Sequence, residues 1–197
     1  MSADDLDRGF AELLASIDGY EPLSATHVAP FHFWVHEPSD TVELHRRLPR
    51  YLARLDDAGF SVTRVSLAKL LWQVVDASGR DEDWLEDAAN RPAASVMRYV
   101  PDGLRDDLRA RTKPGLAESL APYVADTTPG RLVLVTDAAL VHPWFRIRTL
   151  ESHLHDRVRC PTVVLYPGRR VGQHALQFLD LYAEDPNYRS SAVGGHS

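Results

Sequence analysis

Two runs of apolar residues in the C-terminal third constrain the fold of this chain more than any other feature. They are RLVLVTD at 131–137 and PTVVLYP at 161–167. Short apolar runs of this kind are typical of strands that are buried on both faces, as in a parallel sheet. Clusters of aromatic and β-branched residues predict two further strands at 31–36 and 60–67.

Amphipathic stretches separate these strands, with apolar residues that recur three and four positions apart. The predicted helices lie at 3–18, 41–58, about 70–77, 101–125 with an interruption near 113–115, 143–158 and 172–184. Pro49 predicts a kink in the second helix or its division into two shorter helices. Strands that alternate with helices favour right-handed crossovers and a mostly parallel sheet covered on both sides.

The sequence therefore predicts an α/β fold in which a mostly parallel sheet of about four strands is flanked by helices. We expect a single domain over residues 1–190 and a flexible tail over 191–197. The layout is similar to that of a nucleotide-binding domain, but the chain contains no Walker motif.

The distribution of charge predicts one basic region on an acidic protein. The 197 residues carry a formal net charge of −6, which argues against sequence-independent binding of nucleic acid by the whole surface. Residues 131–178 nevertheless hold seven arginines against three acidic residues, a balance of +4, whereas residues 1–130 sum to −8 and residues 179–197 to −2. A local basic face is therefore expected.

Two other features of the sequence bear on the class of protein. The single cysteine, Cys160, excludes an internal disulfide and a cysteine-rich zinc site. The chain has no apolar run long enough to span a bilayer, and its acidic N-terminus does not resemble a signal peptide. We expect a soluble cytoplasmic protein without a membrane partner.

The segment YPGRRVGQ, 166–173, is the first candidate site. Gly168 and Gly172 bracket Arg169 and Arg170 directly after a buried strand and before a predicted helix, which is the layout of a loop that holds a phosphate. The glycines are one residue closer than in a Walker motif, and Gln-His stands where Lys-Ser/Thr would bind phosphate and Mg²⁺. A Pro-Gly turn with solvated arginines explains the same residues.

Metal binding and nucleophilic catalysis have little support in the sequence. His32 and His36 would lie roughly 13 Å apart on one strand, too far to share a metal ion. Cys160 is placed as a small buried thiol, and no G-x-S-x-G elbow is present. Asp137 ends a strand where open α/β sheets place functional groups, although an aspartate that turns the chain accounts for it as well. We expect no metal, no cofactor and no catalytic residue.

Further candidates lie around the last helices. Arg146 and Arg148, with His142 nearby, can form a cationic edge together with Arg169 and Arg170, or a solvated helix face. Tyr188 and Arg189 near the C-terminus have the same ambiguity. Three tryptophans are either anchors for a partner or core residues: Trp34, Trp84 and Trp144.

Residues 131–190 resemble the BrxB family of bacterial BREX phage-defence proteins. The similar pattern consists of RLVLVTD, then Pro143 with Arg146, then PTVVLYPG with its Leu-Tyr-Pro-Gly string, then Gly172 with ALQFLDLY, then Asn187-Tyr188-Arg189. The chain departs from the family pattern in two places: it has Asp137-Ala138-Ala139 instead of glycines after the first strand, and Arg146-Ile147-Arg148 instead of Arg-x-His.

The resemblance implies a non-enzymatic accessory or scaffold protein that contacts other BREX components, notably a PglZ-like protein of the alkaline-phosphatase-like superfamily. It implies no catalytic residue, and DNA would be reached only indirectly. Two alternatives stay open. The chain could bind a nucleotide or a phosphate ester with the 166–173 loop and Arg146, or contact DNA with its basic segment.

Overall fold

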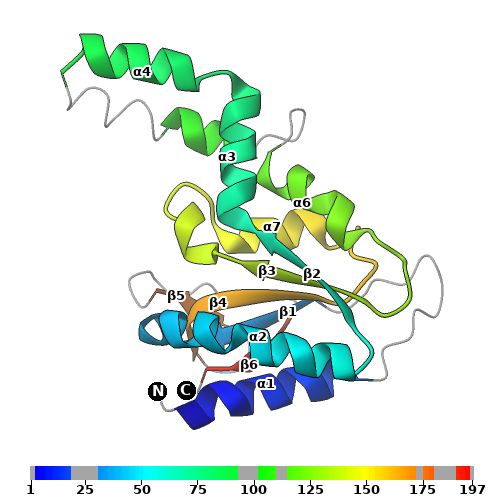
Figure 1. The fold of residues 1–197 in the computed structure, drawn as a ribbon. Coiled ribbons are helices and arrows are strands. Elements are labelled where there is room, and N and C mark those ends of the chain that lie inside the picture. The colour runs from blue at the N-terminus through cyan, green and yellow to red at the C-terminus, as the bar shows by residue number, and fades with distance from the viewer. Residues whose placement is uncertain are drawn as a thin grey trace.

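The computed structural model describes residues 3–18, 31–92, 102–109, 115–171, 175–179 and 190–195. It confirms the α/β fold, with a mostly parallel sheet between helices (Figure 1). The strands along the sheet follow the order β2-β3-β4-β1-β6, and neighbours on this path run parallel. They are β1 (Phe31–His36), β2 (Ser61–Ser66), β3 (Arg131–Thr136), β4 (Thr162–Val171) and β6 (Ser191–Gly194). One further short strand, β5 (Ala175–Phe178), lies off this path and pairs antiparallel with the end of β4.

Helices cover the sheet on both faces. The helices α1 (Ala3–Ile17) and α2 (Thr41–Asp57) pack on one face, and the short η1 (Pro38–Asp40) precedes α2. The other face is covered by four segments: α3 (Leu67–Ser78), α6 (Leu116–Val124), η2 (Ala138–Val141) and α7 (Ile147–Leu154). None of the helices in the described ranges is long and apolar enough to cross a membrane.

Alternation along each central strand builds the two cores. On β1, Phe33 and Val35 point into the core under α3 and α6, whereas Trp34 points into the core under α1 and α2. The same holds for β3, whose Val133 and Leu134 lie in opposite cores. Successive side chains of a strand point to opposite faces, so a strand buried on both sides needs an unbroken apolar run. The prediction for β3 and β4 is thus confirmed.

One part of the molecule extends away from the sheet. The long axis of α3 leads from β2 to α4 (Asp81–Asn90) and to the helical residues 102–109, which lie beyond the end of the sheet (Figure 1). We call α3, α4 and residues 102–109 the arm. Arg80 and Asp107 join its parts through a contact of 3.2 Å between guanidinium and carboxylate, and Leu104 and Leu108 are buried.

The C-terminal segments differ from the prediction. The expected helix at 172–184 is wrong for residues 175–178, which form β5; residues 172–174 and 180–184 lie outside the described part of the chain. The expected flexible tail at 191–197 is wrong for residues 191–194, which form β6 beside β1. Both strands are only four residues long and take their stability from a neighbouring strand. The described residues therefore form a sheet of six strands, compared with the predicted number of about four.

Two helices also differ in detail. The helix α2 runs without a break through Pro49, because Leu48 and Tyr51 on either side of the proline pack into the same core. The helix predicted from residue 143 begins only at Ile147, since η2 and a turn occupy the preceding residues.

Candidate functional site

Several of the sequence-predicted candidates lie at one edge of the sheet. Parallel strands end on the same side, and the segments that follow them begin there. This carboxyl edge therefore holds the end of β1 at His36, the residue after β3 at Asp137, the N-terminus of α7 and the extension of β4 beyond Pro167. It is the side on which open α/β sheets place their functional groups.

The loop expected to hold a phosphate is a β-hairpin. β4 continues through Pro167 and Gly168, and it pairs with β5 from Gly168 to Val171. A Cβ atom on Gly168 would lie 2.1 Å from the carbonyl oxygen of Gln177, so this glycine allows the two strands to approach. A phosphate loop needs the N-terminus of a helix, and a strand stands in its place. Gly172 lies outside the described residues.

The two arginines of the hairpin face opposite sides. Arg170 is paired across the hairpin with Leu176, on the face where Tyr166 and Phe178 join the core. Arg169 points the other way, and its Nε donates a hydrogen bond of 2.7 Å to Oε1 of Gln177. The sequence analysis grouped the two arginines together, and only the structure shows that they face opposite sides of the hairpin.

Aromatic contacts bind the hairpin to the segment before α7. Tyr166 is buried and meets Phe178 edge-on, with 5.1 Å between the ring centroids. The His142 ring stacks on Phe178, also at 5.1 Å. Burial lowers the pKa of His142, and the positive charge of Arg146 lowers it further. Arg146 follows this segment at the N-cap of α7.

Arg146, Arg170 and His142 all lie at this carboxyl edge, and we call them the basic face. Arg146 is exposed at the N-cap of α7, and Arg170 is half-buried. No described acidic residue forms an ion pair with Arg146 or Arg170 within 4.0 Å. Arg148 lies half-buried on the first turn of α7. Tyr188 and Arg189 lie outside the described residues.

A second polar group at the carboxyl edge contains a residue that the sequence did not reveal. Asp137 has a left-handed backbone with φ of 65°, and its carboxylate accepts a hydrogen bond of 2.9 Å from the Thr136 hydroxyl. Its other oxygen lies 3.8 Å from Nε2 of His45 on α2, while Nδ1 of His45 donates to the Thr41 carbonyl at 2.8 Å. This contact places His45 of α2 beside the end of β3. No local motif joins residues 92 positions apart, so only the fold could identify His45.

The buried histidines of β1 belong to the core. Burial lowers the pKa of His32 to about 4. Burial also lowers the pKa of His36 to about 4, with a smaller contribution from the charge of His45. Nε2 of His36 lies 3.3 Å from the Thr41 hydroxyl, whose proton is donated to the Pro38 carbonyl. His36 is therefore neutral at pH 7 and holds the start of α2 against the end of β1.

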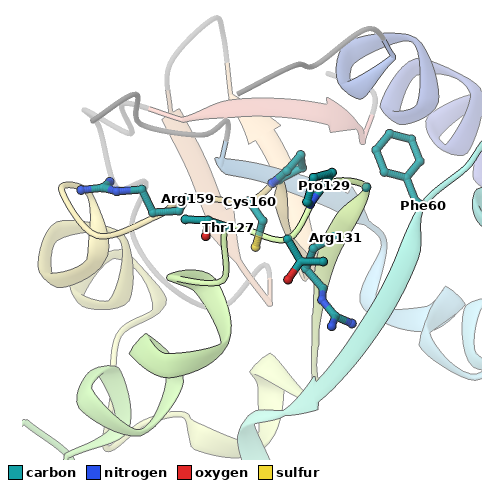
Figure 2. Close-up of a pocket in the computed structure, with 9 residues that line it drawn as sticks. Phe60, Thr127, Pro129, Arg131, Arg159 and Cys160 are labelled. Atoms are coloured by element: carbon teal, nitrogen blue, oxygen red, sulfur yellow. The ribbon is translucent and has the colours of Figure 1, made fainter. Parts of the chain in front are cut away.

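A small pocket lies at the opposite, amino edge of the sheet (Figure 2). Its lining comes from the segments that lead into β2, β3 and β4: Phe60, Thr127–Arg131 and Arg159–Pro161. Its free volume of about 20 Å³ holds roughly one water molecule, far less than a nucleotide needs. Burial raises the pKa of Cys160 beside it to about 11, so this thiol is not a nucleophile at pH 7.

The described residues contain no group of three metal-ligating side chains placed for a metal ion. Of the tryptophans, Trp34 is buried, and Trp84 and Trp144 pack partly against the core. Trp72 on α3 is instead the exposed one, with 64% of its surface accessible.

Residues 63–193 match the family model described as BREX protein BrxB. The match covers about two thirds of the chain, from β2 to β6, and so extends beyond the 131–190 segment that carries the resemblance in the sequence. No curated protein and no solved structure matches the chain.

Proposed function

Because the chain belongs to the BrxB family, we propose that it is a component of a BREX phage-defence system and acts without catalysis, by binding other proteins of that system. The family match carries the first part of this proposal. The second part is supported by the composition of the carboxyl edge, which offers exposed cations and aromatic packing.

We further propose that the basic face is the contact surface for the PglZ-like partner that the family resemblance implies. Arg146 follows the segment whose His142 stacks on Phe178, and Arg170 lies on the strand that pairs with β5. Arginines on a rigid support suit binding to carboxylates on a partner, because each guanidinium can donate two parallel hydrogen bonds.

The experiment is a pull-down of the tagged protein after co-expression with the PglZ-like protein of its own host. Wild type should retain the partner. The variant Arg146→Glu/Arg170→Glu should recover at least about tenfold less of it, since reversed charges repel an acidic partner surface. The matched control is Arg169→Ala, on the opposite side of the hairpin, which should retain it. Equal retention of the partner by all three proteins would contradict the proposal that the basic face is the contact surface. If wild type retained no PglZ-like protein, the proposed partner itself would be wrong.

The nucleotide alternative loses its main support, because β5 stands where the phosphate loop required a helix. A DNA contact by the basic face would show a steep loss of affinity with salt, in proportion to the number of phosphates bound. Titration of the purified protein with ATP and Mg²⁺, and with duplex DNA at two salt concentrations, tests both. Hydrolysis of ATP would contradict the non-enzymatic proposal.

A further inference from the structure

The arm carries an exposed helix face for which the described part of the chain provides no cover. On α4, the residues Glu82, Leu85, Glu86 and Ala89 follow the three- and four-residue spacing of one helix face, and all four are exposed. Leu85 has 71% of its surface accessible. The other side of α4 carries Trp84, which packs against Gly103 and the core. We call the four exposed residues the acidic face.

Charge determines what can cover the acidic face. The ten residues of α4 include five carboxylates and no basic residue. Neither Glu82 nor Glu86 forms an ion pair with a basic side chain of the described residues. An occupant must therefore bring cations on both sides of an apolar contact for Leu85.

The same chain presents that chemistry at its carboxyl edge. Leu140 on η2 has 60% of its surface accessible, and it lies next in the chain to the segment that carries His142 and Arg146. Arg170 adds a second cation from β4, which pairs with β5, and β5 carries the Phe178 ring on which His142 stacks. The carboxyl edge thus offers an exposed leucine and two arginines, and the acidic face offers an exposed leucine and two glutamates.

We propose that the acidic face of one copy docks on the basic face and Leu140 of a second copy. Within one chain the two surfaces are apart, because α3 lies between α4 and the sheet (Figure 1). The contact joins two different surfaces, so each bound copy still offers one free surface, and association continues head to tail into short open chains. One helix face forms a small interface, so the contact is reversible and sensitive to salt.

The test uses the purified full-length protein alone. Sedimentation velocity over about a hundredfold range of concentration should show association that grows with concentration at about 50 mM salt and weakens at about 500 mM. Glu82→Arg/Glu86→Arg and Arg146→Glu/Arg170→Glu should each reduce the association constant by at least about tenfold. An equimolar mixture of the two variants should associate again, because each reversed surface then meets its complement.

Asp56→Arg/Asp57→Arg is the matched control, since it makes the same change of net charge on exposed residues at the end of α2. This control should associate as wild type does. A wild type that stays monomeric at low salt, or a variant mixture that does not associate, would overturn the proposal. Restoration in the mixture also demonstrates that both variants are folded. The test needs no BREX partner, so its failure and that of the partner proposal are distinguishable.

Discussion

The hydroxyl of Ser191 forms a hydrogen bond with Nδ1 of His32, and this contact joins the last strand of the sheet to the first. His32 lies on β1 and Ser191 on β6, at paired positions of the parallel register. Nε2 of His32 is buried without a partner in the described part of the chain. A charged imidazolium would be costly here, so the edge of the sheet depends on a neutral histidine.

We predict that the protein loses stability as the pH falls from about 6.5 to 5. The folded-state pKa of His32 and of His36 is about 4, below the unfolded value of 6.5, so the unfolded chain binds more protons in this window. Each histidine should then lower the free energy of unfolding by roughly 2 kcal/mol at pH 5. Urea unfolding at several pH values measures the loss. His32→Gln should make the dependence shallower, and a free energy that stays constant over this window would contradict the prediction.

Glu151 on α7 secures the start of β6. Glu151 is 4% exposed, and its carboxylate accepts hydrogen bonds from the Ser190 amide, at 2.7 Å, and from the Ser190 hydroxyl. Glu151→Ala leaves a backbone N–H without its acceptor, so we expect a loss of about 2 kcal/mol in unfolding free energy. Amide exchange at Ala192 and Val193 should accelerate. Glu151→Gln retains an acceptor oxygen and should lose less; equal losses would show that the hydrogen bond is not the cause.

The parts of the fold that could be predicted are those whose signal is local. β3 and β4 follow from apolar runs that only burial on both faces explains, and α1 and α2 follow from helical spacing of their apolar residues. The parts that could not be predicted depend on distant partners. The strand β6 forms by pairing with β1, and the hairpin packs on the core around Tyr166. His45 and Asp137 lie close together only in the folded chain.

The segment 175–178 illustrates how the prediction failed. ALQF lies in a stretch whose leucines fit a helical period, but in the structure Leu176 and Phe178 alternate onto one face of a hairpin. A segment of four residues is compatible with both the helical spacing and the two-residue alternation of a strand. The packing of Phe178 against Tyr166 and His142 favours the strand. Arg169 and Arg170 lie on a β-hairpin, and residues 175–178 form a strand where the sequence predicted a helix.

Gly168 of the hairpin should be difficult to replace with any other residue. A Cβ atom there would meet backbone, the Gln177 carbonyl oxygen at 2.1 Å, and neither strand can move without separating the pair. Gly168→Ala should therefore cost more than about 2 kcal/mol of unfolding free energy. Gly79→Ala is the control, because it meets no atom within 4 Å and adds only the strain of a φ of 63°, about 1 kcal/mol. Thermal or urea unfolding compares the two, and a smaller loss for Gly168→Ala would contradict the close approach.

Cys160 should be unreactive in the folded protein. Its thiol is buried and donates weak hydrogen bonds to the carbonyls of Tyr123 and Val124, at 3.7 and 3.6 Å. With the pKa raised to about 11, the folded state holds roughly two orders of magnitude less thiolate at pH 8 than an unfolded chain. Reaction with a chromogenic disulfide reagent should be slow in buffer and fast in urea. Since labelling then requires opening of the structure, its rate should rise in Gly168→Ala and Glu151→Ala in step with their loss of stability, whereas rapid labelling of the wild type in buffer would mean that the amino-edge pocket admits the reagent.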